Sequence, residues 1–265
     1  MDGMGNFLHT FVICAYGESP YLQDCVESLV NQTVNSLICI ATATPNELIS
    51  SISSSYSLPL YIRDGNPGIA DDWNYAISCV DTPFVTIAHQ DDVYSSDYAK
   101  RAVSALSKSD KPQIYFTDYG ELRDGVFIES SALARIKRYL LKPYTLRALR
   151  SRKVFKRLPL SFGNPICCPS VTYALDNLPN PLFNLGFRSN LDWDAWERFS
   201  RYKGEFIYDD GYIGMHHRVH GGSETSSCIV DDVRTKEDFE MLCRFWPKLI
   251  ASGINCFYRK AQKLN

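Results

Sequence analysis

The sequence lacks the features that mark zinc-bound, disulfide-bonded and membrane-embedded proteins. Its nine cysteines are odd in number and scattered, with no CxxC pair, so neither a zinc site nor a disulfide framework is indicated. No segment approaches the roughly 18 apolar residues of a membrane-spanning helix, and no basic region followed by an apolar one opens the chain. We therefore expect a cytoplasmic protein with reduced, buried thiols.

The composition is that of a globular protein, but the charge is unevenly distributed. The chain has 265 residues, 45% hydrophobic and 22% charged, enough for one large domain or two small ones. Residues 1–129 carry 6 basic and 17 acidic side chains, a net of −11, whereas residues 130–265 carry 22 and 13, a net of +9. This asymmetry predicts an anionic molecule or a membrane surface as the partner of the basic half.

Hydrophobic periodicity predicts βαβ units over the first 120 residues, and therefore a mainly parallel sheet. Ser19 and Pro20, after the first strand, have the residue types of a helix N-cap and a first helical position. Because parallel strands end at one edge of the sheet, the residues after them are candidate ligand contacts. The predicted strands cover residues 11–15, 37–42, 58–62, 84–88 and 113–116, with helices after the first strand and over residues 69–78 and 97–107.

The sharpest local signal is the tetrapeptide His89-Gln90-Asp91-Asp92, which directly follows the apolar run Phe84–Ala88. Two carboxylates at the end of a buried strand repel each other and require a compensating cation. Carboxylate oxygens suit Mg²⁺ or Mn²⁺, which bind few protein ligands and leave positions for substrate phosphates. The alternative is a turn whose aspartates cap the helix that begins near Asp97, and the tetrapeptide alone does not decide between the two.

Several further motifs occur in a definite order along the chain. They are Ala15-Tyr16-Gly17-Glu18, Ser28-Leu29-Val30-Asn31-Gln32-Thr33, Asn66-Pro67-Gly68 through Asn74, His89–Asp92, Leu191–Arg198 and Arg218–Thr225. Together they resemble the motifs of the family 2 glycosyltransferases with the GT-A fold, over roughly residues 10–226. In that resemblance His89–Asp92 stands at the position of a D-x-D-D metal motif, Leu191–Arg198 at that of E-D-x-D-x-W-x-x-R, and Arg218–Thr225 at that of R-x-H-x-x-S-x-T.

The resemblance implies an α/β protein of the GT-A class, with a Rossmann-like, mainly parallel sheet flanked by helices and a C-terminal, acceptor-side region of helices and loops. Residues 1–129 would bind the nucleotide sugar and residues 130–265 would form the acceptor side, as two parts or as one continuous domain. The implied reaction is inverting, metal-dependent transfer of a hexosyl group from a UDP- or dTDP-sugar to a glycan or lipid-diphosphate-linked acceptor. Rhamnosyltransferase-like enzymes of bacterial surface polysaccharide (O-antigen) synthesis are the implied subtype.

The resemblance also assigns roles to individual residues. Asp192 would be the general base for the acceptor hydroxyl, because Asp194 lies about 200° further around the helix and cannot face the same group. Asp92, with Asp91, would hold Mn²⁺ or Mg²⁺, whereas Trp193, stacked on a sugar, and Asp194 would lie on the acceptor side. Without the resemblance, the pattern favours a solvated helix acid or an N-cap at Asp192. The implied donor contacts are Ala15, Tyr16, Glu18, Asp64, Asn74, His89, Gln90, Asp91, His217, Arg218 and His220.

Three departures from the family pattern affect the donor site. The second predicted strand ends in Thr42-Ala43-Thr44, without the aspartate that reads a uracil or thymine ring, so Asp64 is the substitute. Trp73 stands where an arginine often contacts phosphate, and His89 replaces the first aspartate of the metal motif. These departures leave open a nucleotide-sugar-binding protein without catalysis. A sugar nucleotidyltransferase is a weaker alternative, because the loop after the first strand has no basic residue.

The basic half contains one strongly cationic segment. Residues Arg135–Arg157 include ten Lys and Arg and no acid, interleaved with apolar side chains such as Ile136 and Tyr139. Amphipathic basic segments bind anionic lipid headgroups at about 1 kcal/mol per cation, so we predict peripheral attachment to the inner face of the cell membrane. The alternative is a solvated helical face that balances the acidic half. No nucleic-acid-binding motif is present, and nucleic acid is not an expected partner.

Overall fold

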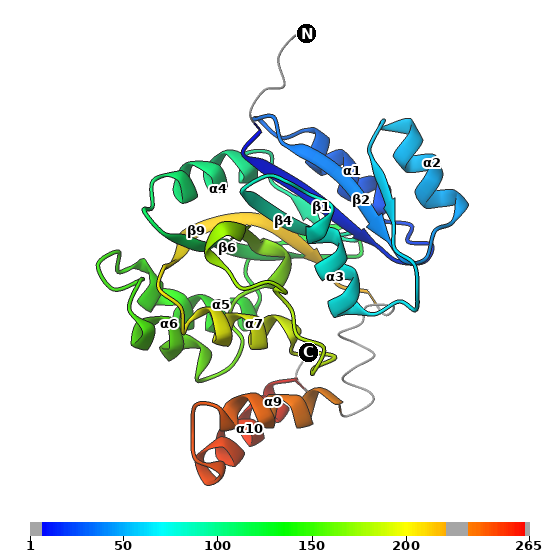
Figure 1. The fold of residues 1–265 in the computed structure, drawn as a ribbon. Helices are drawn as coiled ribbons and strands as arrows, with labels where there is room; N and C mark the ends of the chain where they lie inside the picture. Colours follow the sequence, from blue (N-terminus) through cyan, green and yellow to red (C-terminus); the bar gives the residue numbers. More distant parts are fainter. Residues whose placement is uncertain (1–6, 221–232, 263–265) are drawn as a thin grey trace.

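One mixed sheet organises the part of the chain that the computed structural model describes, residues 7–220 and 233–262 (Figure 1). Within this part nine strands join in the order β3-β2-β1-β4-β8-β6-β9-β5, and β7 pairs with β6 outside this path. The strands are β1 His9–Ala15, β2 Leu37–Thr42, β3 Leu60–Ile62, β4 Phe84–His89, β5 Val93–Tyr94, β6 Pro112–Arg123, β7 Val126–Ile128, β8 Val171–Ala174 and β9 Glu205–Arg218.

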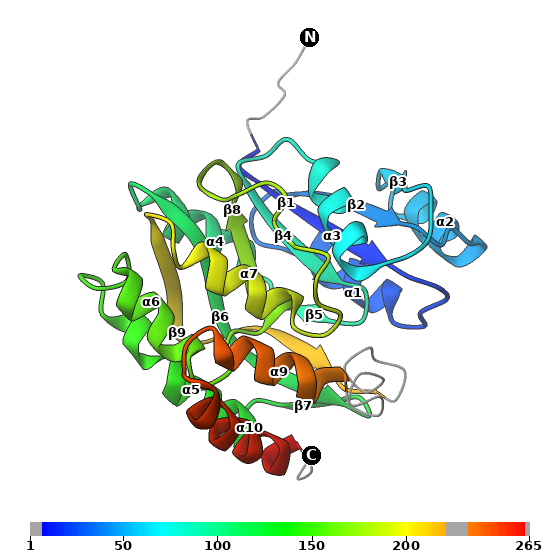
Figure 2. The same cartoon turned by 60° about the horizontal axis from the view of Figure 1, so that its bottom comes forward.

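Helices cover both faces of the sheet, as Figures 1 and 2 show. Phe11 and Ile13 of β1 pack with residues of α1, α2 and α4 on one face. Val12, which points to the other face as strand alternation requires, packs with residues of α3, α7 and α9. The helices are α1 Leu22–Val30, α2 Glu47–Ser55, α3 Ile69–Ser78, α4 Tyr98–Ser107, α5 Ala132–Leu141, α6 Lys153–Leu160, α7 Leu191–Phe199, α9 Val233–Cys243 and α10 Lys248–Gln262.

The first half of the sheet confirms the predicted βαβ units. β1 pairs in parallel with β2 and β4, and β2 pairs in parallel with β3. The run Phe11-Val12-Ile13 is fully buried, because helices cover both sides of this strand. Because these strands run parallel, β1, β2, β3 and β4 all end at the same edge of the sheet. Just after β1, Gly17 turns the chain with a φ of 58°.

Beyond β4 the parallel pattern stops, which the sequence did not predict. β8 lies between β4 and β6 and runs antiparallel to both, whereas the 14-residue β9 runs parallel to β6 and antiparallel to β5. Both β8 and β9 follow residue 130, so strands from the acidic and the basic half share one sheet. Gly120 of β6 permits this close pairing, since a Cβ atom there would lie 2.4 Å from Cδ2 of His216.

Three local predictions need correction. α1 begins at Leu22 rather than at Pro20, because the Ser19 hydroxyl accepts from the Tyr21 backbone N–H, 3.3 Å away, and shapes the preceding turn. α2 occupies a serine-rich segment in which no helix was predicted, and Asn46 caps it by accepting from the N–H of Ile49. β6 continues to Arg123, well beyond its predicted end at residue 116.

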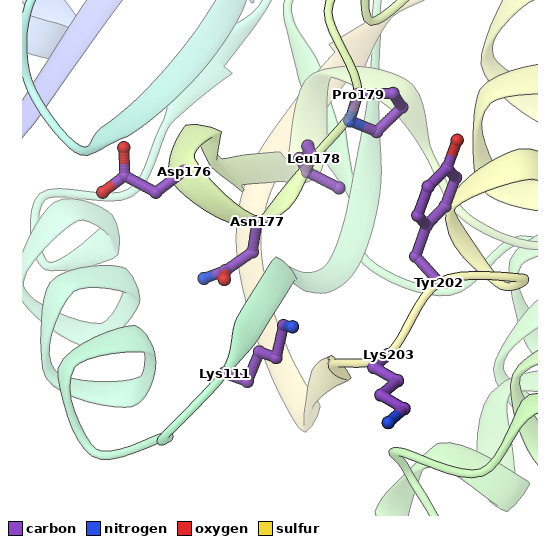
Figure 3. Close-up of a pocket in the computed structure, with 7 residues that line it drawn as sticks. All are labelled: Lys111, Asp176, Asn177, Leu178, Pro179, Tyr202 and Lys203. Carbon is purple, nitrogen blue, oxygen red and sulfur yellow. The ribbon is translucent and has the colours of Figure 1, made fainter.

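A buried lysine marks the edge of the sheet opposite to the strand ends of the first half. Nζ of Lys156 donates to Oε1 of Gln113 at 2.7 Å and to the carbonyls of Tyr202 at 2.7 Å and Gly204 at 3.1 Å, and burial lowers its pKa to about 8. A pocket of about 210 Å³ opens beside Tyr202. Figure 3 shows Tyr202 facing Leu178 and Pro179 across this pocket. The pocket lies at the start of β6, and so at the opposite edge of the sheet from the predicted site.

All eight cysteines that the structure describes are free thiols, and among them only Cys256 is exposed. The ninth, Cys228, lies outside the described residues.

Candidate functional site

The carboxylate of Asp92 is the centre of the site. Its side chain is fully buried just beyond the end of β4. Oδ1 accepts from Nδ1 of His217 and from the backbone N–H of Arg218, each at 2.9 Å, so β9 holds this oxygen. Oδ2 has no hydrogen bond to any residue that the structure describes, and Nδ1 of His89 lies 4.0 Å from it. One oxygen of a buried carboxylate is therefore left to interact with a further group.

Two histidines flank Asp92, and their pKa values are shifted in opposite directions. Burial lowers the pKa of His217, but the charge of Asp92 and the hydrogen bond to it outweigh burial and raise the pKa overall. For His89, burial outweighs the charges of Asp92 and Asp91, so its pKa is lowered. The His89 ring stacks on Trp73, with ring centroids 5.2 Å apart. His217 thus favours the cation, whereas His89 favours the neutral imidazole, which can offer a lone pair.

Asp91 is held by the end of β9 and the residues after it. Burial raises the pKa of Asp91, but the hydrogen bond from Nε2 of His220, at 2.8 Å, and the nearby His89 and His217 outweigh burial and lower it. Arg218 donates through Nε to the Asp91 carbonyl at 2.9 Å and through Nη2 to Asp24 at 2.8 Å. Arg218 therefore braces Asp91 against α1. Residues 221–225 of the predicted Arg218–Thr225 motif lie outside the described residues.

The loop after β1 is fixed by Gln90. The Tyr16 backbone N–H donates to Oε1 of Gln90 at 3.0 Å, and Nε2 of Gln90 donates to the Tyr16 carbonyl at 2.9 Å. Both ends of this amide are thus used within the protein, which replaces the predicted donor contact of Gln90. Tyr16 itself is 62% exposed. Ala15 ends β1, and Glu18 and Asp64 are exposed near the same edge of the sheet.

Asn74 holds two segments together rather than facing a ligand. Its Nδ2 donates to the Phe183 carbonyl at 2.8 Å, and the Phe183 N–H donates to Oδ1 at 3.0 Å. This reciprocal pair ties α3 to the segment before α7. It replaces the donor contact predicted for Asn74, because the backbone of Phe183 occupies the amide.

Asp192 lies in the first turn of α7 and is held by two donors. Oδ1 accepts from the Trp193 N–H at 2.8 Å, and Oδ2 accepts from Nδ2 of Asn164 at 2.6 Å. Burial raises the pKa of Asp192 despite these bonds and the opposing charges of Arg234 and Lys137. Burial lowers the pKa of His89 overall, and the charge of Asp192 is among the weaker influences that oppose this, so the two groups lie near each other. A partly exposed carboxylate with a raised pKa is suited to accept a proton.

The two acceptor-side predictions beside Asp192 are wrong. Trp193 is 1% exposed, and its indole N–H donates to a carbonyl of α6 at 3.1 Å, so it packs in the core and presents no face to a sugar. Asp194 is 2% exposed and accepts from three side chains, those of Asn184, Arg198 and Arg244. Among residues 191–194, Asp192 alone is not fully buried. The remainder of this turn belongs to the core.

Two residues near Asp192 were missed by the sequence reasoning. Nζ of Lys137 on α5 lies 5.1 Å from the ring centroid of Tyr119, and its charge weakly opposes the overall rise in the pKa of Asp192 and of His217. Asn164 follows α6 and donates to Asp192. Lys137 belongs to the cationic segment and Asn164 to a loop rich in proline and asparagine. Neither could be assigned before it was known which turn of each segment faces the sheet.

The surroundings of Asp92 fit a divalent ion that takes few protein ligands. Oδ2 of Asp92 and Nε2 of His89 are both buried and without hydrogen bonds to the described residues. Over residues 7–220 and 233–262, no three His, Cys, Asp or Glu side chains form a metal cage. Such an ion would need oxygens from a bound phosphate, which is the usual arrangement for Mg²⁺ and is compatible with Mn²⁺.

A sheet with a parallel βαβ half and a mixed half, flanked by helices on both faces, is the architecture of the GT-A glycosyltransferases. The family model described as "Glycosyl transferase family 2" matches residues 10–161, which is more than half of the chain. The protein therefore belongs to glycosyl transferase family 2. The matched residues include Asp91 and Asp92 but end before α7.

Solved structures of similar fold support the same architecture. TarS 1–349 from S. aureus in complex with UDP-GlcNAc has a TM-score of 0.61 and 14% identity, over 93% of this chain and 70% of that one. The mannosyltransferase PcManGT from Pyrobaculum calidifontis, in complex with GDP-Man and Mn²⁺, has a TM-score of 0.60 and 12% identity, over 95% and 70%. In another TarS structure this chain covers 42% of the longer chain. No curated protein sequence matched.

Proposed function

We propose that the protein is an inverting, metal-dependent glycosyltransferase that moves a sugar from a nucleotide diphosphate to an acceptor hydroxyl. The observation that carries this proposal is the contrast between two carboxylates that both lie near His89. Asp92 is fully buried, with one oxygen that makes no hydrogen bond to the described residues, whereas Asp192 is partly exposed and has a raised pKa. The first suits a cation at the donor diphosphate, and the second suits a proton from the acceptor.

In this proposal Asp192 performs the proton transfer. Its carboxylate takes the proton of the acceptor hydroxyl while the hydroxyl oxygen forms a bond to the anomeric carbon of the sugar. The bond from that carbon to the diphosphate oxygen breaks on the opposite face, and the nucleoside diphosphate leaves with the electron pair. Asp92, braced by His217, would hold Mn²⁺ or Mg²⁺, which would neutralise the leaving diphosphate. Lys137 would add positive charge near the reacting groups.

The donor would bind along the edge formed by the ends of the parallel strands. Tyr16, Glu18 and Asp64 are exposed there, and Asp64 replaces the aspartate missing after β2 as the candidate contact to a uracil or thymine ring. A UDP- or dTDP-sugar is therefore the donor we propose. GDP remains a necessary comparison, because the similar PcManGT structure is a complex with GDP-Man.

We further propose a lipid-diphosphate-linked acceptor of the surface polysaccharide type, met at a membrane. Within residues 135–157, most cations contact groups of the protein, as Arg138 does with Asp118 and Arg150 with Glu205. The segment nevertheless has exposed cations and exposed apolar side chains, which we propose form one surface, here called the basic–apolar face: Arg135, Ile136, Tyr139, Arg147, Arg152, Lys153 and Val154. This combination suits the headgroup region of an anionic bilayer.

No helix in the described ranges 7–220 and 233–262 is both long enough and apolar enough to cross a bilayer.

Thermal unfolding with nucleotides tests the donor site. UDP, dTDP and GDP, and their sugars, are added with and without Mn²⁺, and the shift in Tm is measured. A ligand at a hundred times its Kd stabilises the native state by about 2.7 kcal/mol, which is readily detected. We expect UDP or dTDP to raise Tm more with Mn²⁺ than without it. If no nucleotide raises Tm, the donor site is wrongly assigned.

Substitution of the two carboxylates separates their roles. Asp192→Asn is expected to lower kcat by about 10²–10⁴, the usual contribution of a general base, with the Tm shift by UDP unchanged. Asp92→Ala is expected to remove the Mn²⁺-dependent part of that shift and to abolish transfer. Wild-type turnover in either variant would reject that residue's role. A protein that only binds nucleotide sugars would release no nucleotide from the donor even as wild type.

A further inference from the structure

The helix that carries Asp192 has no side-chain cap of its own. Asn190 is the N-cap residue of α7, but its side chain makes no capping hydrogen bond. Its Nδ2 instead donates to Oδ1 of Asp238 on α9, at 2.8 Å. The amino end of α7 is thus held by a helix that comes more than 40 residues later in the chain.

The neighbouring Glu237 makes the main contact. Its Oε1 accepts from the Arg188 N–H at 2.7 Å, and its Oε2 accepts from the N–H groups of Ser189 at 2.8 Å and Asn190 at 2.9 Å. Successive backbone N–H groups that converge on one anion form a stable nest. A negative charge just before a helix also interacts favourably with the helix dipole. Glu237 therefore restrains the three residues that lead into α7.

A second contact lies on the other side of Asp192. Nη1 of Arg244, directly after α9, donates to Oδ1 of Asp194 at 2.6 Å. The α9 segment thus contacts the chain both before and after Asp192. Among the described residues, the Asp192 carboxylate accepts hydrogen bonds from Nδ2 of Asn164 and from the Trp193 backbone N–H. Because the Trp193 N–H belongs to the first turn of α7, the contacts that α9 makes on both sides of this turn also bear on the direction of the carboxylate.

We propose that Glu237 is a positioning residue of the transfer reaction, which aims the Asp192 carboxylate by clamping residues 188–190. The inference rests on the proposed function of Asp192 and adds a contribution from the C-terminal segment. Displacement of a reacting group by about 1 Å can cost on the order of 10²-fold in rate. The clamp is therefore expected to affect the chemical step more than donor binding.

The test compares three variants of the full chain. Glu237→Ala is expected to lower kcat by about ten- to a hundredfold while donor KM and the Kd of UDP change by less than about twofold. Glu237→Gln retains one carbonyl oxygen as acceptor and is expected to recover part of kcat. Glu240→Ala removes the same charge from an exposed position of the same helix, and all three constants should stay within about twofold of wild type.

Wild-type kcat in Glu237→Ala would overturn the proposal. A fall in kcat accompanied by an equal loss of UDP affinity would also overturn it, because that pattern indicates general loss of structure. If Glu237→Ala does not fold, the kcat of Glu237→Gln and its affinity for UDP decide the question in the same way. In the Asp192→Asn background, Glu237→Ala should add little to the loss of kcat, since both act on one group. A fully additive loss would contradict positioning.

Failure of the proposed function gives a different result. Wild-type turnover in Asp192→Asn would reject the base itself. An inactive Asp192→Asn together with a fully active Glu237→Ala would reject the clamp alone.

Discussion

At the scale of single residues, opposing effects set the pKa of Asp192. Burial raises it, whereas the hydrogen bond from Asn164 stabilises the charged form and lowers it. The base acts only when deprotonated, so kcat should fall as the pH drops through this pKa. Because the pKa is raised, the fall should lie above the usual aspartate range near 3.9.

Replacement of Asn164 tests this balance directly. Asn164→Ala removes a donor to the charged form, so the pKa of Asp192 should rise further and the acidic limb of the kcat profile should move to higher pH. The measurement is kcat against pH for both proteins. Asn177→Ala, at the pocket on the opposite edge of the sheet, is the control and should leave the limb in place. A limb that stays or moves to lower pH in Asn164→Ala would refute the account.

Asp91 and Asp92 could be singled out because they follow a buried strand, whereas the role of Asp192 came only from the resemblance of its helix to a family motif. Neither signal could show how each oxygen is used. His217 and the backbone N–H of Arg218 reach Oδ1 of Asp92 across more than 120 residues, whereas Oδ2 has no hydrogen bond to the residues that the structure describes. Asn74 and Gln90 were assigned to the donor for the same reason: their backbone partners are distant in sequence.

At the scale of elements, α7 is held by buried ion pairs. Glu197 is fully buried and contacts Arg157 of α6, whose side chain is 20% exposed, and Arg201, whose side chain is 53% exposed. Removing one partner of a buried charge costs far more than removing an exposed one. The two arginines should therefore differ in their contribution to stability although both contact the same carboxylate.

Urea unfolding of two variants measures that difference. Arg157→Ala is expected to lower the free energy of unfolding by about 3 kcal/mol, because it leaves a buried carboxylate poorly paired. Arg201→Ala, the matched control, is expected to lower it by less than about 1 kcal/mol. Equal losses in the two variants would show that exposure does not control the strength of these pairs.

The elements of the first half were predictable and those of the second half were not. β1, β2 and β4 are apolar runs between turns, and their burial on both faces produces that pattern. β9 contains the polar residues Asp209 and Asp210 and the glycine Gly211 in its middle, and register shifts interrupt its pairing with β6 near Asp118. Irregular pairing disturbs the alternation on which a strand prediction depends. β8 has only four residues, too few for a pattern.

At the scale of the whole molecule, the positive charge of the second half is only partly exposed. Most cations of residues 135–157 are turned toward acids or the site, so the basic–apolar face carries four exposed cations, Arg135, Arg147, Arg152 and Lys153. In Figures 1 and 2, α5 and α6 lie side by side away from β1 to β3. The face that would meet a membrane is thus separate from the strands that would hold the nucleotide.

Vesicle sedimentation tests this face. Changing its four cations to Ala should weaken binding to phosphatidylglycerol-containing vesicles by on the order of 10²–10³-fold, at about 1 kcal/mol per cation. Vesicles of phosphatidylcholine alone should bind neither protein. Removing Lys100, Lys108 and Lys111, exposed cations on or after α4, is the control and should have little effect. Added salt should weaken vesicle binding more than UDP binding. Equal vesicle binding by both variants would reject the proposal that the basic–apolar face binds the membrane.

The sequence by itself determined the βαβ half, the order of the motifs and the carboxylates after β4, because strand burial and turn chemistry act over a few neighbouring residues. The tertiary structure alone decided that β9 braces Asp92, that Trp193 and Asp194 belong to the core, and that Glu237 reaches the start of α7. These outcomes depend on which faces of distant elements meet. Side-chain direction at such contacts follows from packing of the whole chain, and no local pattern encodes it.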